Sequence, residues 1–383
     1  MRPRTDVEGL AGARSEVLFR LAYAFGALVV LAAFLHQPGI EHYGPSELGR
    51  MVDGTASKPF VYRVLVPWTI RGAIELIPAD IQHWLVDAGG RGRLAAALAF
   101  CDHVPARQCT AFLVATVIMY GALLGFCFAL RQLLSTVFVA PRTFVSAVPL
   151  FGLALLPPFF CYTSFVYDFP ALLLFTLGLS LMVRERWSAY LLVFVSACFN
   201  KETTVLLLVV FAVHFRERLA RRSLLGVLAA QAVAFAVIKA GLAWTFHGNA
   251  DVAVDHLGHN LNLLRACPPS TAVSWLTLVL LVVARWPDKP RFLKDSLWIL
   301  VPLLGLTLFL GFLDELRDFY EAFPPVILLI AHSVAGLAGI DVQRATPERK
   351  ALAERPQPPS LSPASERPRR PKRPPQALAS RAL

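Results

Sequence analysis

Long apolar runs separated by short charged connections make up most of the chain. The first run covers residues 21–35, and nine more follow at 110–130, 143–160, 169–183, 187–199, 203–215, 223–246, 271–284, 296–313 and 323–340. A helix that crosses a hydrocarbon core of about 30 Å needs roughly 20 apolar residues. The pattern therefore predicts an all-α, multi-pass membrane protein with about ten transmembrane helices.

The composition supports this class. Hydrophobic residues make up 56% of the chain and charged residues only 16%, with a mean hydropathy of +0.56, which excludes a soluble domain of this length. Residues 341–383 hold ten Lys/Arg and four Asp/Glu, so they supply six of the net charge of +11. This Pro/Arg-rich tail cannot build a core, and we expect it to be disordered. The basic excess therefore implies no nucleic-acid partner.

The charges also predict an orientation. If residues 36–109 form a long outward loop, the connections on the other side carry twelve Lys/Arg and four Asp/Glu, against ten and fifteen on the outward side. The positive-inside rule then places both the basic N-terminus, residues 1–20, and the tail in the cytoplasm, flanking an integral membrane domain of residues 21–340. The Ala/Arg/Leu-rich composition suits a bacterial inner membrane.

Two features of the loops predict local structure. Pro67 is expected as a first helical residue, and the short run after it carries charges, so it fits a helix lying in the membrane interface.

The apolar segments 187–199 and 203–215 have thirteen residues each, about 20 Å of helix. Their tip at 200–202 is therefore expected below the outer surface, between two short helices or in a re-entrant hairpin.

Ionisable groups at membrane depth are costly, which makes charged residues beside the apolar segments the main functional candidates. Three outward turns carry them: TSFVYDFP with Asp168, NKETT with Lys201 and Glu202, and DELRDFYE with Glu315 and Arg317. Structural roles are the alternative. Lys201 can pair with Asp168 or Glu202 to close its turn, Arg317 can pair with an acid three residues before or four residues after it, and Asp168 can cap the following helix.

The first loop adds the acids Glu41, Glu47 and Asp53, followed by Arg63 in the sequence PFVYR. As alternatives to a catalytic role, Asp53-Gly54 forms a turn, and Arg63 pairs with Asp53 or extends to the interface.

Metal and cysteine patterns are weak. The loop from His247 to Asn260 contains Asp251, Asp255, His256 and His259, whose side chains suit a divalent metal but form no specific motif. Cys101 and Cys109 fall in the first loop, where an oxidising compartment would permit a disulfide. Cys127 and Cys198 lie in apolar spans and are expected to be packing residues.

Several motifs are absent from the sequence: a P-loop, HExxH, GxSxG and the DxD acid pair of many nucleotide-sugar enzymes.

Two function classes other than an enzyme stay open. A transporter or flippase would use the Lys/Glu/Asp set as a substrate path, although no repeated halves are visible. A non-catalytic partner of an envelope-assembly complex would use the Pro/Arg tail.

The combination of PFVYRVLVPW after the first span, the Tyr167-Asp168 turn, the Asn200–Glu202 turn and Glu315-x-Arg317 resembles the GT-C superfamily of membrane glycosyltransferases. The resemblance covers most of residues 17–340. It departs from several of these families in lacking a paired DE or DD near the first span.

That resemblance implies transfer of a sugar from a polyprenyl-phosphate donor to an envelope polymer, lipid or protein on the outward face. It implies a catalytic base among Asp53, Glu47 and Glu41, and a phosphate grip from Lys201, Arg317 or Arg63. Supporting carboxylates would be Asp168, Glu202 and Glu315. No cofactor is implied with certainty, although a divalent metal is compatible with it.

Overall fold

The computed structural model describes residues 5–90, 105–160, 162–252 and 254–345, with side chains described from residue 14 and up to residue 87 in the first range. The chain divides into two units, Met1–Ala345 and Thr346–Leu383, of which the second lies outside the described residues. The prediction of a disordered tail therefore stays a prediction beyond Ala345.

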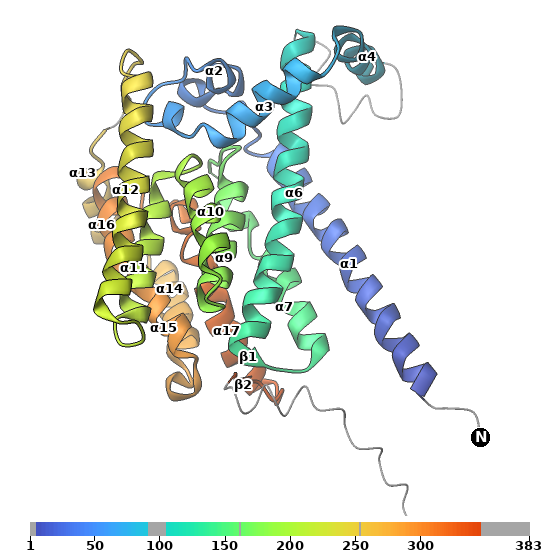
Figure 1. The fold of residues 1–383 in the computed structure, drawn as a ribbon, viewed down its shortest axis with the longest axis vertical. Helices are drawn as coiled ribbons and strands as arrows, with labels where there is room; N and C mark the ends of the chain where they lie inside the picture. The colour runs from blue at the N-terminus through green and yellow to red at the C-terminus, as the bar shows by residue number, and fades with distance from the viewer. Residues whose placement is uncertain (1–4, 91–104, 161, 253, 346–383) are drawn as a thin grey trace, which may run out of the picture. The chain divides into compact units, whose positions relative to one another are not determined.

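The first unit is almost entirely helical, which confirms the all-α class (Figure 1). Its α-helices are α1 (Thr5–His36), α2 (Leu48–Asp53), α3 (Leu65–Leu76), α4 (Ala79–Gly90), α6 (Ala106–Val137), α7 (Arg142–Ala154), α8 (Pro157–Phe160), α9 (Asp168–Val183), α10 (Trp187–Cys198), α11 (Leu206–Phe215), α12 (Arg221–Thr245), α13 (Leu257–Arg265), α14 (Pro269–Val283), α15 (Arg291–Ser296), α16 (Leu300–Leu310) and α17 (Phe323–Leu337).

Short elements join them. The 3-10 helices are η1 (Gly44–Ser46), η2 (Phe60–Tyr62), η4 (Glu202–Val205), η5 (Trp286–Asp288), η6 (Leu297–Ile299) and η7 (Leu316–Phe319). Strand β1 (Phe138–Val139) pairs antiparallel with β2 (Gln343–Arg344), with Phe138 opposite Arg344. The membrane domain was predicted to end at Ile340. The first unit instead continues through β2 to Ala345, five residues further.

Each of the ten predicted spans coincides with an apolar helix, but their lengths differ. Within the described residues, five helical stretches are long and apolar enough to cross a membrane: Arg14–His36, Ala106–Val137, Arg142–Phe160, Arg221–Thr245 and Arg291–Leu310. A sixth is possible if α13 and α14, bent by 96°, form one broken span. The remaining apolar helices, α9, α10, η4 with α11, and α17, have 10–17 residues. The multi-pass class is confirmed, whereas the structure leaves the predicted number of ten crossings unconfirmed.

Helix α6 lies at the centre of the bundle and packs on α1, α7 and α9. Because lipid is as apolar as a helix surface, such packing depends on close van der Waals fit more than on escape from water. Small residues provide that fit. A Cβ added at Gly178 of α9 would lie 2.9 Å from Leu207 of α11, and one at Gly125 of α6 would lie 3.1 Å from Leu173.

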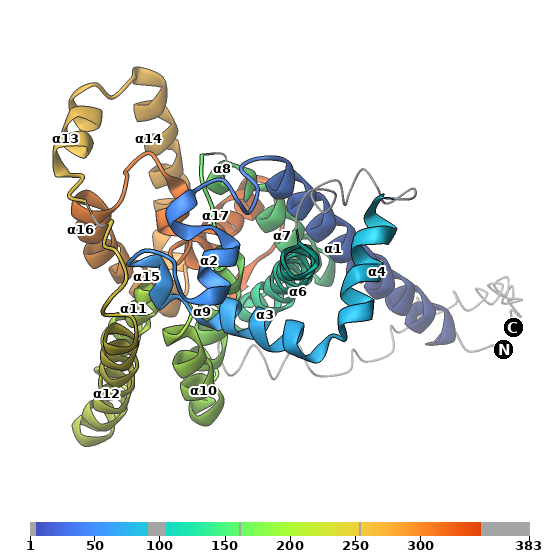
Figure 2. The ribbon, with the colours of Figure 1, turned by 90° about the horizontal axis from the view of Figure 1, so that it is seen from above.

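The first loop folds into short helices that cross one end of the bundle (Figures 1 and 2). Helix α3 buries Val66, Ile70 and Ile74 on one side and has only twelve residues, about 18 Å of helix. This agrees with an interfacial helix rather than a span. The helix begins at Leu65, so Pro67 is its third residue and not its first as predicted.

This loop is held in place by backbone contacts with distant segments. The Lys58 amide donates to the Ala250 carbonyl at 2.8 Å, and the Leu65 amide donates to the Phe199 carbonyl at 3.0 Å. The Asn249 side chain donates to the Gly54 carbonyl at 2.9 Å. Gly54 has φ of 75°, so the predicted turn after Asp53 is confirmed. The loop is therefore an ordered cover over the tip between α10 and α11.

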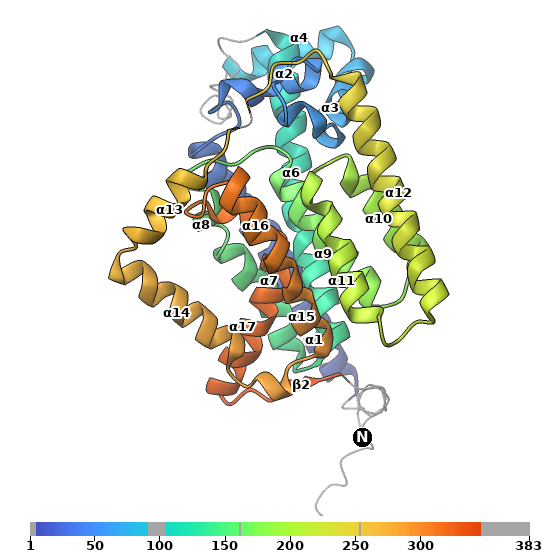
Figure 3. The ribbon, with the colours of Figure 1, turned by 90° about the vertical axis from the view of Figure 1, so that its left-hand side faces the viewer.

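A buried lysine ties two helices together at the other end of the bundle. The ammonium of Lys289 donates to the carbonyls of Leu281, Val282 and Leu329 and to the Ser333 hydroxyl, at 2.7–3.2 Å. A cation at the last carbonyls of α14 also favours the helix dipole. Helices α13 and α14 form an elbow with few buried side chains; α13 packs on α16 and α14 on α17, while the bend between them stands away from the other helices (Figure 3).

Candidate functional site

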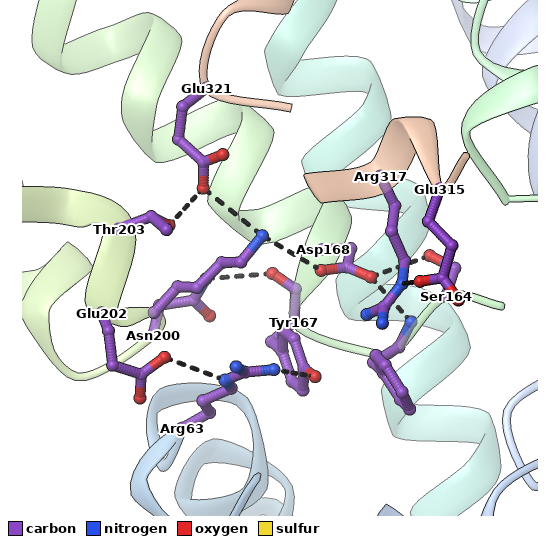
Figure 4. Close-up of polar contacts among 12 residues, drawn as sticks. Arg63, Ser164, Tyr167, Asp168, Asn200, Glu202, Thr203, Glu315, Arg317 and Glu321 are labelled. Carbon is purple, nitrogen blue, oxygen red and sulfur yellow. Dashed lines mark hydrogen bonds and ion pairs between the residues drawn. The ribbon is translucent and has the colours of Figure 1, made fainter. Parts of the chain in front are cut away.

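Five segments far apart in sequence bring charged side chains together at the first loop. They are the residue after η2, the start of α9, the tip between α10 and α11, helix α12, and the turn before α17; Figure 4 labels residues from all of them except α12. The side chains, which we call the charged cluster, are Arg63, Asp168, Lys201, Glu202, Lys239, Glu315, Arg317 and Glu321.

Lys201 lies between two buried carboxylates. Its ammonium is 3.4 Å from Glu321 Oε1 and 3.8 Å from Asp168 Oδ1. The side chains of Lys201, Glu321 and Asp168 are 8%, 3% and 0% exposed, so water contributes little to their solvation. Thr203 also donates a hydrogen bond to Glu321. The tip is buried beneath the first loop, while its predicted depth below the outer membrane surface stays a prediction. Of the two predicted partners of Lys201, the structure selects Asp168.

Asp168 fixes the turn that precedes it. Its Oδ2 accepts hydrogen bonds from the Ser164 hydroxyl at 3.0 Å and the Phe165 amide at 2.9 Å. The predicted role as N-cap of the following helix is wrong, because Asp168 is the first residue of α9 and its carboxylate reaches backward. Asn200 donates to the Tyr167 carbonyl at 2.9 Å and joins this turn to the tip.

Glu202 faces away from Lys201 and joins two other cations. Arg63 Nε donates to one of its oxygens at 3.1 Å, and the ammonium of Lys239 lies 3.5 Å from the other. The predicted pairing of Arg63 with Asp53 is wrong. The side chains of Arg63, Lys239 and Glu202 are 13%, 16% and 34% exposed, so this part of the cluster is the more accessible one.

Lys239 was missed by the sequence analysis. Its only signal was one cation inside the apolar segment 223–246, with no charged neighbour within that segment. In the part of the chain that the structure describes, its ammonium nitrogen is buried and has no hydrogen-bond acceptor. An ammonium group has three donors, and one carboxylate at 3.5 Å, that of Glu202, leaves at least two of them available.

Two stacked aromatic rings separate the two arginines of the cluster. The rings of Phe165 and Tyr167 stack at 5.3 Å with an angle of 19°. Arg317 lies over Phe165 at 4.6 Å, and Arg63 lies over Tyr167 at 4.5 Å. Arg63 also donates to the Tyr167 hydroxyl. Each such cation–π contact contributes about 0.5–2 kcal/mol, and together they hold both guanidinium groups in defined positions.

Arg317 forms its ion pair with Glu315, two residues before it in the chain. Its Nε donates to Glu315 Oε2 at 2.7 Å, so the predicted pairing with Asp314 or Glu321 is wrong. Only Leu316 stands between the two residues, and Glu315 has an extended backbone just before η7. The pairing at positions three and four residues apart in an α-helix therefore does not apply here. Burial raises the pKa of Glu315 above its usual value, although Arg317 opposes this.

The predicted first-loop acids lie outside the cluster. Asp53 ends α2, is 57% exposed and faces Arg107 at 3.4 Å. Glu47 immediately precedes α2. Glu41 is half-buried, and one of its oxygens has no hydrogen-bond partner among the described residues. Burial, and secondly the charge of Glu47, raise the pKa of Glu41.

The next residue, His42, does reach the cluster. Its ring lies 5.3 Å from the ring of Phe165. Its Nε2 contacts the Thr163 hydroxyl at 2.5 Å. Sequence reasoning passed over His42 because a single histidine after an apolar span has many structural roles.

The possible metal and disulfide sites have separate outcomes. Among the described residues, no group of three His, Cys, Asp or Glu side chains is placed to hold a metal ion. His259 instead faces Asp314 at 3.8 Å.

Cys109 is disulfide-bonded, while Cys101, its predicted partner, lies outside the described residues. Cys127 and Cys198 are free and buried, as expected for packing residues.

An apolar groove of about 720 Å³ lies between α11 and α16, and no side chain of the charged cluster lines it. It is lined by Val205, Leu206, Leu208, Val209, Pro302, Gly305, Leu306, Phe309 and Leu310. Val205 and Glu202 are three residues apart in η4, and side chains at this spacing in a 3-10 helix lie on the same side. The groove therefore begins beside the arm of the cluster that contains Glu202, Arg63 and Lys239.

Comparisons with known proteins give no further assignment. The chain matches no protein-family model, no curated protein and no solved structure.

Proposed function

We propose that this chain is a membrane glycosyltransferase that moves a sugar from a polyprenyl-phosphate donor to an envelope acceptor on the outward face. The observation that carries the proposal is the charged cluster, buried beneath the first loop and bordered by an apolar groove. An anionic head group with a long hydrocarbon chain fits both parts. Burying this many ionisable groups is costly, and such sites in membrane proteins are mostly functional.

Apart from the pair of Arg317 and Glu315, the charges of the cluster divide into two groups. Lys201 with Asp168 and Glu321 carries a net charge of −1, because one ammonium faces two carboxylates. Arg63 and Lys239 share the single carboxylate of Glu202, which leaves +1. The second group is the more accessible one and lies at the groove. We therefore assign the donor phosphate to Arg63 and Lys239, and a positioning role to Lys201.

This assignment gives a mechanism. The bond between the anomeric carbon and the phosphate oxygen breaks, and the phosphate leaves with the electron pair. Arg63 and Lys239 stabilise the negative charge that develops on that oxygen, and fixed charges in a dry site are effective at this. The acceptor oxygen forms the new bond to the opposite side of the anomeric carbon, with inversion. The lipid-phosphate linkage supplies the driving force, so no ATP is required.

The remaining groups position these reactants. Asp168 and Glu321 hold Lys201 at the tip, and Glu202 orients Arg63 and Lys239. Glu315 orients Arg317 on the far side of the aromatic stack. Two observations support an outward site: the distribution of Lys/Arg in the loops, and the disulfide of Cys109 at the start of α6, since disulfides persist in oxidising compartments.

The direct test is transfer by purified protein in lipid nanodiscs, with a panel of radiolabelled polyprenyl-phosphate sugars and an envelope-lipid extract as acceptor. We expect transfer from at least one donor and none from the corresponding nucleotide sugars. Absence of transfer from every donor, together with movement of a lipid-linked sugar across proteoliposomes, would instead establish a transporter.

Replacing Glu41 by glutamine is expected to raise the melting temperature at pH 7. The raised pKa means that the folded protein holds the Glu41 proton more tightly than the unfolded chain does. Ionisation of Glu41 therefore costs stability above the ordinary pKa of 4.5, and this cost is absent at lower pH. Thermal unfolding of the wild type and Glu41→Gln should show a difference that disappears below pH 4.5.

The exposed Glu75→Gln is the matched control and should show no such difference. A Glu41→Gln variant that melts below the wild type at pH 7 would mean that the Glu41 carboxylate has a stabilising partner in the fold.

A further inference from the structure

The two ring nitrogens of His42 have different, fixed roles. Nδ1 lies 2.9 Å from the Gly39 carbonyl oxygen, which can only accept a hydrogen bond, so Nδ1 carries the proton. In the neutral ring Nε2 then carries the lone pair. The Thr163 hydroxyl lies at Nε2 and donates to it. The backbone thus selects the tautomer whose basic nitrogen points at a hydroxyl group.

The surroundings of His42 keep it neutral. Burial lowers its pKa from the usual 6.5, and Arg317 acts in the same direction, while the Gly39 bond and Asp168 oppose them. Arg317 lies over Phe165, the ring on which His42 also packs. Glu41, its neighbour in the chain, interacts with Glu47 and the Leu48 amide. At neutral pH the ring is therefore a base with an available lone pair.

We propose that His42 is the general base that takes the proton from the acceptor hydroxyl; this rests on the proposed function. The acceptor hydroxyl replaces the Thr163 hydroxyl at Nε2. As the acceptor oxygen bonds to the anomeric carbon, its O–H bond breaks and an N–H bond forms at Nε2. The electron pair of the broken sugar–phosphate bond leaves with the phosphate, and the imidazolium later releases its proton to water.

The position of His42 fits an in-line displacement. The leaving phosphate, assigned to Arg63 and Lys239, lies at the Tyr167 end of the aromatic stack, and His42 lies at the Phe165 end. An inverting reaction needs its base and its leaving group on opposite sides of the anomeric carbon. A sugar that lies alongside the edges of the two stacked rings would have His42 on one side of its anomeric carbon and the phosphate on the other. Asp53, by comparison, faces Arg107 and is exposed.

The test compares the wild type with His42→Asn, whose amide can still donate to the Gly39 carbonyl but cannot act as a base. In the transfer assay kcat/KM of the wild type should rise with pH through a pKa below 6.5. His42→Asn should lose about 10²-fold and lose that rising limb. Imidazole added to His42→Gly should restore part of the rate. His259→Asn, at a half-exposed histidine outside the cluster, is the control.

A second variant separates catalysis from structure. Thr163→Val removes the hydroxyl from Nε2 but leaves the imidazole in place, so whatever its rate, kcat/KM should keep the rising limb with pH. Loss of that limb in Thr163→Val would overturn the proposal, because the pH dependence would then come from the His42–Thr163 contact and not from proton transfer to His42. If kcat/KM of His42→Asn rose with pH as it does in the wild type, the role of His42 as the base would also be overturned. The proposed glycosyltransferase function would still stand in that case. Wild-type protein that transfers from no donor would refute the proposed function, and the role of His42 with it.

Discussion

Replacing Lys201 by methionine is expected to destabilise the protein by about 3–5 kcal/mol. The substitution leaves the buried carboxylates of Asp168 and Glu321 without the cation that lies between them. Removing one partner of a buried ion pair costs more than the pair contributes, because the remaining charge is desolvated and uncompensated. Thermal and denaturant unfolding in the same detergent would measure the loss.

A second substitution should recover part of that loss. In the double variant with Lys201→Met and Glu321→Gln, only one buried carboxylate remains, and the neutral amide still accepts from Thr203. The two changes should therefore be strongly non-additive. Lys294→Met, at a partly buried lysine that contacts Trp286 and no carboxylate of the charged cluster, is the control. A Lys201→Met protein as stable as this control would mean that the carboxylates are protonated or have other partners.

Replacing Lys239 by methionine is expected to weaken binding of polyprenyl phosphate by about 10²-fold, because a charge-assisted bond to phosphate contributes about 1.5–3 kcal/mol. The folded state should tolerate this change. Glu202 keeps its bond to Arg63, and an apolar side chain is less costly than an ammonium at membrane depth. Binding of polyprenyl phosphate in nanodiscs, followed by native mass spectrometry, is the measurement.

The comparison with Lys294→Met and two further ligands makes the binding test specific. Inorganic phosphate should bind much more weakly than polyprenyl phosphate, because it cannot fill the apolar groove. Phosphatidylglycerol should not compete at equal concentration if the site recognises a phosphate monoester. If Lys239→Met bound polyprenyl phosphate as tightly as the wild type, the assignment of the phosphate to Arg63 and Lys239 would be wrong. Arg317 would then be the next residue to replace.

Lys201 and Lys239 have different expected roles although their surroundings in the sequence are similar. Both lie near apolar segments, and both pair with carboxylates. Lys201 is saturated by two acids and is nearly inaccessible, whereas Lys239 shares one acid with Arg63 and keeps at least two of its donors. We therefore expect Lys201 to matter first for stability and Lys239 first for ligand binding.

Much of the architecture could be predicted from the pattern of apolar residues. Every predicted apolar segment is a helix, since hydrocarbon solvates no backbone polar group and only a helix satisfies them within one segment. The shortness of two segments predicted a recessed tip at Lys201, and Lys201 is buried. The turn at Gly54 followed from local residue type, because glycine adopts a positive φ without steric cost. These properties depend on neighbours in the chain.

The composition of the charged cluster was decided only by the tertiary structure. Lys201 and Glu321 are far apart in sequence, as are Arg63 and Glu202. A charge pattern shows which residues need partners but carries no information on which segments meet. Lys239 and His42 entered the site for the same reason, because helix packing brought α12 to Glu202 and the turn after α1 to Phe165. Sequence determined the helices and the charged turns, and packing between distant segments determined the site.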